Sequence, residues 1–229
     1  MSRQLTLALP HRAALGREDF LVAPSNRAAV ALIDSWPNWP AHAVLMIGPA
    51  GSGKSHLVEV WRGRSGAPRI EAERVGAAGV PELLRQGSLA IEDLPGPSLD
   101  ERGLFHLHNL ARESGVQLLL TSASRPGSWD LALPDLVSRL RAAPVVELGP
   151  PDDELLRGVL VKHFADRQLA VDESLLSYLI ARMPRSLDAA RLLVSEIDRV
   201  ALEERAEVTR PLASRILAGF ASPGLFGED

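Results

Sequence analysis

The spacing of apolar and polar residues divides the chain into two parts with different periods. In the first part, short apolar runs alternate with amphipathic stretches, as in a parallel α/β sheet with helical connections. Its predicted strands are 44–47, 69–75, 89–91, 116–121 and 145–148. Its predicted helices are one that ends at about residue 62 and one at 104–113. In the second part the apolar residues recur at helical spacing, which predicts helices around 155–160, 175–179, 187–201 and 210–218.

Glycine and proline mark the boundary between these parts. The segment Leu148-Gly-Pro-Pro-Asp-Asp153 interrupts both periods, because neither glycine nor proline continues a regular element well. We predict an α/β base and then a small helical domain, with Asp172 as the N-cap of the second helix in that domain. The predicted organisation is a flexible tail at 1–12, the base at 13–150, the helical domain at 151–220 and a second tail at 221–229.

The segment Gly48-Pro-Ala-Gly-Ser-Gly-Lys-Ser55 follows an apolar strand and opens a helix. In this P-loop pattern the glycines let backbone N–H groups face phosphate oxygens, Lys54 reaches the β and γ phosphates, and Ser55 can bind magnesium. A chance glycine-rich turn is the alternative, but the strand-to-helix context favours the phosphate site. We expect ADP or ATP, with Mg²⁺, as the ligand.

Two carboxylates, Glu92 and Asp93, follow the predicted strand at 89–91. A phosphate site needs an acid on a neighbouring strand to hold magnesium or to orient water, and this segment looks like a Walker B sequence. The usual order is an aspartate and then the longer glutamate. The order is reversed here, so we expect slow hydrolysis, and an acidic strand end or helix cap remains the alternative.

Composition narrows the class of protein. The 229 residues carry a formal net charge of −4, are 46% hydrophobic and 24% charged, and include no cysteine. No apolar run approaches the roughly 18 residues that span a bilayer, so we expect a cytoplasmic protein without membrane insertion. The acidic balance argues against broad binding to nucleic-acid backbones. His106 and His108 are two apart on a predicted helix, on different faces, and do not form a metal-ligand spacing.

Several separated segments resemble one family. They are Phe20-Leu-Val-Ala-Pro-Ser-Asn-Arg27, Gly51-Ser-Gly-Lys-Ser-His-Leu57, Leu119-Leu-Thr-Ser-Ala-Ser-Arg-Pro126 and Leu133-Pro-Asp-Leu-Val-Ser-Arg-Leu140. In order and spacing they resemble the DnaA branch of the AAA+ ATPases, in particular the short DnaA-related inactivators called Hda or HdaA. The resemblance covers nearly the whole chain. It implies an AAA+ P-loop base with a parallel sheet, followed by a small all-α lid domain.

The resemblance also implies roles for individual residues. Thr121 or Ser122 would sense the γ-phosphate, Ser55 and Glu92 would hold Mg²⁺, and Glu92, Asp93 and Thr121 would form the catalytic set with an arginine finger. The implied nucleotide contacts are Leu21, Val22, Asn26, Pro49, Ala50, Gly51, Ser52, Gly53, Lys54, Ser55 and His56.

Arg139 occupies the position of that arginine finger. Such a group stabilises charge on the γ-phosphate of a neighbouring subunit, so the resemblance implies that Arg139 acts on ATP bound by another protein. A surface arginine after a turn is the alternative.

The N-terminal segment Gln4-Leu-Thr-Leu-Ala-Leu9 resembles the peptide with which Hda proteins dock on the DNA polymerase sliding clamp. Gln4 would make polar contacts while Leu5, Leu7 and Leu9 fill an apolar pocket. A strand at the sheet edge is the alternative, because apolar residues alternate there.

Three departures distinguish this chain from DnaA initiators. About a dozen residues, 76–88, separate the second and third predicted strands, too few for the helix pair that engages single-stranded DNA. No helix-turn-helix domain is expected before Asp229, so we expect no direct sequence-specific DNA binding. The sensor 2 arginine aligns near Asp188, which repels phosphate. Arg185 or Arg191 replaces that arginine, or both are solvated.

These observations lead to one main hypothesis and two alternatives. The main hypothesis is a regulatory adaptor that docks on the clamp, presents Arg139 to ATP-bound DnaA, and so represses re-initiation of replication. Its own ATPase activity would be weak, and a homo-oligomer is one open possibility. The alternatives are an autonomous P-loop ATPase or small-molecule kinase, and a helicase-loader-like or initiator-like module that polymerises on DNA.

Overall fold

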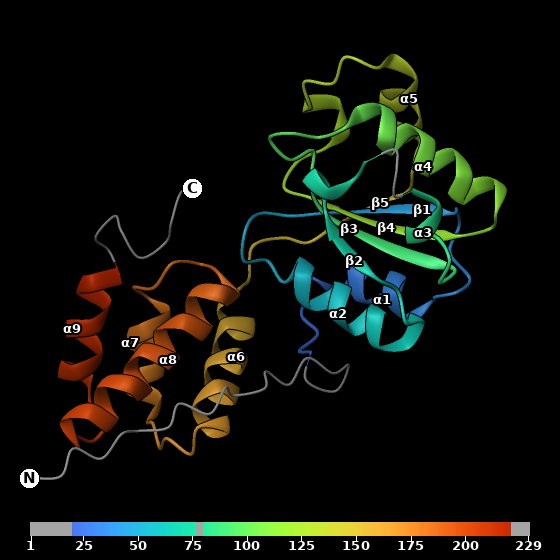
Figure 1. The fold of residues 1–229 in the computed structure, drawn as a ribbon. Coiled ribbons are helices and arrows are strands. Elements are labelled where there is room, and N and C mark those ends of the chain that lie inside the picture. The colour runs from blue at the N-terminus through green and yellow to red at the C-terminus, as the bar shows by residue number, and fades with distance from the viewer. Residues whose placement is uncertain (1–19, 77–79, 221–229) are drawn as a thin grey trace, which may run out of the picture.

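The structure is a computed structural model that describes residues 20–76 and 80–220. The predicted clamp-binding residues Gln4, Leu5, Leu7 and Leu9 lie outside the described residues, as do both predicted tails. Figure 1 shows two bodies, a sheet covered by helices and a group of helices beside it. In the described ranges no helix is both long and apolar enough to cross a membrane.

Within the described residues, five parallel strands form one sheet in the order β2-β3-β4-β1-β5. The strands are β1 Ala43–Ile47, β2 Arg69–Glu71, β3 Ser88–Leu94, β4 Gln117–Ser122 and β5 Val145–Glu147. Every residue of β1 is buried, as expected for a central parallel strand that helices cover on both sides. Parallel sheets bind ligands at the edge formed by the carboxyl ends of their strands. The carboxyl end of β1 lies inside this edge, between those of β4 and β5.

Helices pack on both faces of the sheet (Figure 1). The helices of this body are α1 Arg27–Asp34, α2 Lys54–Ser65, α3 Val80–Leu83, α4 Glu101–Glu113 and α5 Pro134–Ala142, with the short 3-10 helices η2 Ala72–Arg74 and η4 Pro126–Ser128. Alternate residues of β1 face opposite cores. Val44 and Met46 pack with α1 and α2, whereas Leu45 and Ile47 pack with α4 and α5.

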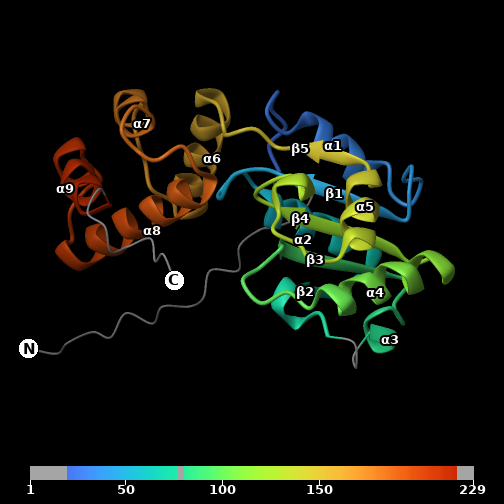
Figure 2. The same cartoon turned by 90° about the horizontal axis from the view of Figure 1, so that it is seen from above.

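The remaining helices form a second core of their own (Figure 2). They are α6 Asp153–Asp166, α7 Glu173–Ile180, α8 Leu187–Glu204 and α9 Arg210–Phe220. A side-chain oxygen caps the first turn of three of them: Asp152 accepts from the Leu155 N–H, Asp172 from Leu175 and Ser186 from Ala189. The predicted cap at Asp172 is therefore confirmed, and its bond to the Leu175 N–H lowers the pKa of Asp172.

Two predicted boundaries in the sheet are wrong. The strand expected at 69–75 ends at Glu71, where the chain turns into η2, because β2 is an edge strand whose pairing with β3 stops there. The strand expected at 89–91 continues to Leu94, because Glu92 pairs with Glu71 on β2 and Leu94 with Ser122 on β4. Glu92 and Asp93 thus lie inside β3. The pairing register between β3 and β4 shifts between Ile91 and Leu94, where these two residues lie.

Candidate functional site

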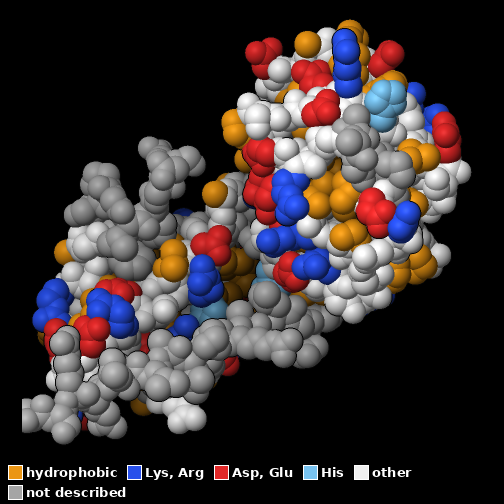
Figure 3. Space-filling model, viewed as in Figure 1, with side chains coloured by type: hydrophobic (Ala, Val, Ile, Leu, Met, Phe, Trp, Pro, Cys, Tyr) orange, Lys and Arg blue, Asp and Glu red, His pale blue; other side chains and the backbone are white. Residues whose placement is uncertain are grey.

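A cavity of about 650 Å³ lies between the sheet body and α6–α9, at the carboxyl end of β1. Figure 3 shows the hollow between the two bodies, with basic side chains on both of its sides. Residues of both bodies line the cavity. From the sheet body these are Phe20, Leu21, Asn26, Ala50, Gly51, Gly53, Lys54, Ser55, His56, Glu59, Arg69 and Asp93, and from the helices Leu155, Val159, Lys162, His163, Asp166, Arg167, Leu187, Asp188 and Arg191.

The P-loop connects β1 to α2 and forms one wall of this cavity. Gly51 and Gly53 have φ values of 69° and 100°, a left-handed conformation that other residues adopt only with strain. The first residues of α2, Lys54 to His56, line the cavity, so the N-terminus of this helix lies at the wall, the arrangement that attracts phosphate. Pro49 and Ser52 belong to the loop but do not line the cavity; Ser52 is buried, and Pro49 is exposed elsewhere on the surface.

Lys54 lies at the base of the loop. Its Nζ donates to the carbonyl oxygens of Gly48 at 2.7 Å and Pro49 at 3.0 Å. Burial lowers the pKa of Lys54, and the carboxylates of Asp93, Glu92 and, more weakly, Asp188 oppose that shift. The ammonium group is therefore held beside the phosphate-binding N–H groups by carbonyls that a bound anion can replace.

The two acids of β3 have different positions. Glu92 is 2% exposed, hydrogen-bonds to Ser55, and pairs with Arg69 at 3.1 Å. Burial raises the pKa of Glu92, and the bond to Ser55 and the charge of Arg69 only partly offset it. Asp93, at φ 59°, lines the cavity, and its N–H donates to the buried Thr121 hydroxyl at 3.1 Å.

These positions separate the predicted catalytic set. Asp93 reaches the cavity, whereas Glu92 and Thr121 lie behind its wall. Glu92 Oε1 is buried without a hydrogen-bond partner, and the Glu92 carboxylate bonds to Ser55, which lines the cavity. The donor set of Ser55 and Glu92 fits Mg²⁺, which prefers oxygen ligands and takes its other ligands from phosphate and water.

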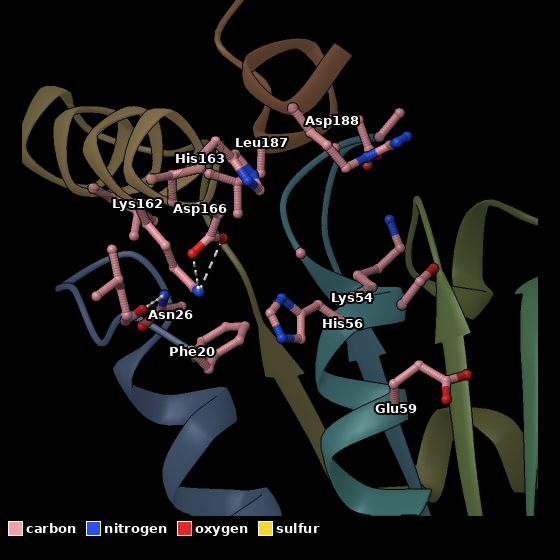
Figure 4. A pocket seen from close by; sticks show the side chains of 18 of the residues that line it. Phe20, Asn26, Lys54, His56, Glu59, Lys162, His163, Asp166, Leu187 and Asp188 are labelled. Carbon is pink, nitrogen blue, oxygen red and sulfur yellow. Dashed lines mark hydrogen bonds and ion pairs between the residues drawn. The ribbon is translucent and has the colours of Figure 1, made fainter. Parts of the chain in front are cut away.

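The segment before α1 forms the opposite wall (Figure 4). Asn26 is 1% exposed, accepts from the Ala23 N–H at 2.9 Å and donates to the Leu21 carbonyl at 2.9 Å, so it fixes the loop through its side chain. Leu21 lines the cavity and the half-exposed Val22 does not. The rings of Phe20 and His56 meet edge to face, 5.0 Å between centroids.

Helices α6 and α8 close the cavity from the other side. Lys162 pairs with Asp166 at 3.2 Å (Figure 4), and burial together with the charge of Arg167 lowers the pKa of His163 to about 4. Lys54 and Lys162 are the two lysines of the chain, and both line the cavity. Sequence reasoning missed the α6 residues, although a basic residue and an acid four apart on a helix, at 162 and 166, were the available signal.

The two arginines considered for sensor 2 are distinguished by the structure. Arg191 lines the cavity beside Asp188, from which it is 4.0 Å. Arg185 does not line the cavity, because it binds Asp153 at 2.7 Å and the Pro151 carbonyl at 3.0 Å. Arg191 is therefore the arginine of α8 that a ligand in the cavity can reach.

The start of α8 contacts the P-loop directly. The Leu187 N–H donates to the Gly51 carbonyl at 2.8 Å. A Cβ atom added to Gly51 would lie 1.8 Å from the Ser186 Oγ, so only glycine fits beneath the cap of α8. Sequence reasoning did not find this contact between segments far apart in the chain, and no local pattern indicates it.

Arg139 lies away from the cavity, on α5. Its guanidinium stacks over the Phe105 ring, 5.0 Å from the centroid, and it lines a second, smaller cavity with His42, His108 and Arg112. His106 is exposed and His108 is buried, so they face opposite ways on α4. The structure therefore places Arg139 apart from the residues that surround the P-loop.

Comparisons with known proteins agree with this fold. No family model matches the chain. An uncharacterized protein of Haemophilus influenzae is 28% identical over 182 residues, which cover 74% of this chain and 79% of that protein. The crystal structure of DnaA domain III from Thermotoga maritima superposes with a TM-score of 0.77 at 22% identity, covering 94% of this chain and 100% of that one.

Two further solved structures are similar. AMPPCP-bound DnaA from Aquifex aeolicus has a TM-score of 0.65 at 18% identity, covering 82% of this chain and 68% of that one. A RuvB structure from Thermotoga maritima has a TM-score of 0.64 at 15% identity, covering 85% of this chain and 67% of that one. The predicted fold class is confirmed: the chain has a DnaA-like AAA+ fold, with a parallel α/β sheet followed by a helical part.

Proposed function

We propose that this chain is a DnaA-related AAA+ regulatory adaptor that binds ADP or ATP and acts through Arg139 on ATP bound by DnaA. The observation that carries the proposal is the separation of its two basic centres. Lys54 and the P-loop face the cavity between the two bodies, whereas Arg139 lies on α5 outside that cavity. An arginine outside that cavity does not reach a nucleotide bound in it, so in this proposal Arg139 stabilises phosphate charge on a second molecule.

The nucleotide would be held by groups from both bodies. Backbone N–H groups of the P-loop and Lys54 would bind the phosphates, and Ser55 with Glu92 would hold Mg²⁺. Leu21, Phe20 and His56 offer apolar and aromatic surface for the base, and Arg191 of α8 offers a cation from the helical side. The AMPPCP-bound state of the similar Aquifex aeolicus DnaA supports this assignment.

Docking on the sliding clamp through Gln4, Leu5, Leu7 and Leu9 completes the proposal. This part rests on the sequence pattern, with a glutamine for polar contacts and leucines for an apolar pocket. Clamp docking would bring the adaptor to DnaA only when the clamp is loaded on DNA, so repression of re-initiation would follow the start of replication.

The test measures hydrolysis of DnaA-bound ATP in the presence of clamp-loaded DNA. Arg139→Ala should reduce the stimulation on the order of a thousand-fold, because an arginine finger contributes about that much to the rate. Arg141→Ala is the matched control, since Arg141 is exposed on the same helix, and it should stimulate as the wild type does. A Gln4→Ala/Leu5→Ala/Leu7→Ala variant should lose the stimulation that depends on the loaded clamp. Undiminished stimulation by both the Arg139 and the tail variants would overturn the proposal.

One observation favours a second candidate, an autonomous ATPase. Asp93 lines the cavity that Lys54 also lines, so a carboxylate faces the phosphate site directly. Steady ATP turnover by the isolated chain, unaffected by DnaA or clamp and lost in Asp93→Asn, would favour this candidate over the adaptor.

A further inference from the structure

A second cavity, of about 170 Å³, lies at the amino end of β1, at the opposite edge of the sheet from the P-loop. Its polar lining comes from four side chains, His42, His108, Arg112 and Arg139, and alanines form the rest. The segment before β1, helix α4 and helix α5 each contribute to this lining. Three elements distant in sequence therefore bring two imidazoles and two guanidiniums to one small hollow.

One ring nitrogen of each imidazole lacks a hydrogen-bond partner, while the His42 ring also bonds to the backbone of His108. Their rings meet edge to face with centroids 4.6 Å apart. His108 is 4% exposed, and both its Nδ1 and the Nε2 of His42 are buried without a partner in the described structure. Leaving a buried polar atom unpaired costs about 1–3 kcal/mol, so such atoms commonly mark a place where a ligand or a water binds.

The charges around the cavity have one sign. No carboxylate lines it, and neither Arg112 nor Arg139 forms an ion pair with any residue in 20–76 or 80–220. Burial, together with the charges of His42, Arg139 and Arg112, lowers the pKa of His108 to about 4. Burial and Arg112 also lower the pKa of His42. Two guanidiniums repel a metal cation, so the imidazole pair does not suit metal binding.

We propose that this cavity is a binding site for a small oxyanion of the phosphate or sulfate type. The guanidiniums of Arg112 and Arg139 would pair with its oxygens, and the unpaired Nε2 of His42 and Nδ1 of His108 would donate to it when they carry a proton. The volume is well below the roughly 300 Å³ at which pockets for larger ligands begin, which excludes a nucleotide. The site is separate from the nucleotide cavity. It shares Arg139 with the function proposed above, but anion binding can be measured on this chain alone, without DnaA.

The test titrates sulfate into ¹⁵N-labelled protein at constant ionic strength, with chloride as the balancing anion. Sulfate is suitable because its charge does not change between about pH 5.5 and 8. The experiment uses the Lys54→Ala variant, which removes the lysine from the other anion-binding candidate. Ring resonances of His42 and His108 should shift with saturation, while those of His56 and His163, which line the nucleotide cavity, should not.

Two arginine variants make the test specific. Arg112→Gln should weaken sulfate about tenfold, the effect of losing one charge-assisted hydrogen bond. Arg102→Gln, at an exposed position of the same helix, should leave the affinity unchanged. Both positions are exposed, so both variants should fold, which circular dichroism checks. Equal weakening in both variants, or a shift that chloride reproduces or that never saturates, would overturn the proposal.

The pH dependence gives a second readout. The titratable and charged groups that face the anion are His42, His108, Arg112 and Arg139, and the arginines stay charged throughout. A bound anion raises the pKa of the imidazoles, so binding takes up protons and the affinity for sulfate should rise as the pH falls from about 8 to 5.5. An affinity that is constant over this range would contradict the part assigned to the imidazoles.

Discussion

Glu92 and Asp93 show how far two adjacent residues can differ in environment. The sequence presents them as one acidic pair, which predicts the same chemistry for both. Successive residues of a strand point to opposite sides, and the φ of 59° at Asp93 turns the chain further. Glu92 therefore lies buried beside Ser55 while Asp93 lines the cavity. Local sequence could predict an acid near the P-loop, but not which acid faces the ligand.

The buried carboxyl of Glu92 leads to a prediction about stability. Burial raises its pKa in the folded protein, so its contribution to stability is full below its unfolded pKa and is lost as the pH rises through the folded pKa. Glu92→Gln cannot ionise. The variant should therefore gain stability relative to the wild type between about pH 5 and pH 8, which urea unfolding at both values measures.

The control for this prediction is Glu113→Gln, an exposed glutamate at the end of α4. Its stability difference from the wild type should be within about 0.5 kcal/mol at either pH, as for most surface substitutions. If Glu92→Gln instead loses stability relative to the wild type as the pH rises over this range, the ion pair with Arg69 outweighs the desolvation of the carboxylate.

At the scale of elements, most strands and helices could be predicted because their apolar period and their capping residues lie within or beside each element. The run Val44–Ile47 is apolar throughout because helices cover both faces of β1. Asp172 accepts a hydrogen bond from the Leu175 N–H, three residues away, so this cap can be predicted from neighbouring residues. The end of β2 and the extension of β3 depend on pairing between strands, which single-sequence reasoning does not see. The docking of α8 on the P-loop was missed for the same reason.

That docking leads to a prediction for Gly51. Gly51→Ala places a methyl group against Ser186 and forces alanine into a left-handed conformation, which alone costs about 1–3 kcal/mol. Ser186→Gly removes the obstructing side chain and keeps most of the capping, at a cost of a few tenths of a kcal/mol. The double variant should be more stable than the sum of the single effects by at least about 0.5 kcal/mol in urea unfolding.

Gly66 provides the matched control. It has nearly the same φ, 68°, but nothing lies within 4 Å of an added Cβ. Gly66→Ala should show the conformational cost alone, and Ser186→Gly should not offset it. Simple additivity in the Gly51 pair would show that the P-loop and α8 are not in contact in solution.

At the scale of the whole molecule, the proposed ligand connects two bodies with separate cores. A ligand at about 100 times its Kd stabilises the folded state by about 2.7 kcal/mol, which for a chain of this size raises Tm by about 5–10 °C. ADP should produce such a shift in a thermal unfolding experiment. Lys54→Ala should abolish the shift at the same ADP concentration.

The arginines of the helical body test whether it takes part in binding. Arg191→Ala should reduce the shift caused by ADP, because Arg191 lines the cavity, whereas Arg185→Ala should leave the shift unchanged, because Arg185 is bound to Asp153. Equal shifts in both variants and the wild type would mean that Arg191 takes no part in nucleotide binding.

The bond between Leu187 and Gly51 joins main chain to main chain, and this has a consequence for mutagenesis. Any amino acid except proline supplies the same N–H at position 187. An alanine scan of α8 would therefore leave this bond between the two bodies intact. The scan would wrongly suggest that no residue of α8 contributes to their contact. Leu187→Pro is the substitution that removes this bond, so it distinguishes a joint made by the backbone from one made by side chains.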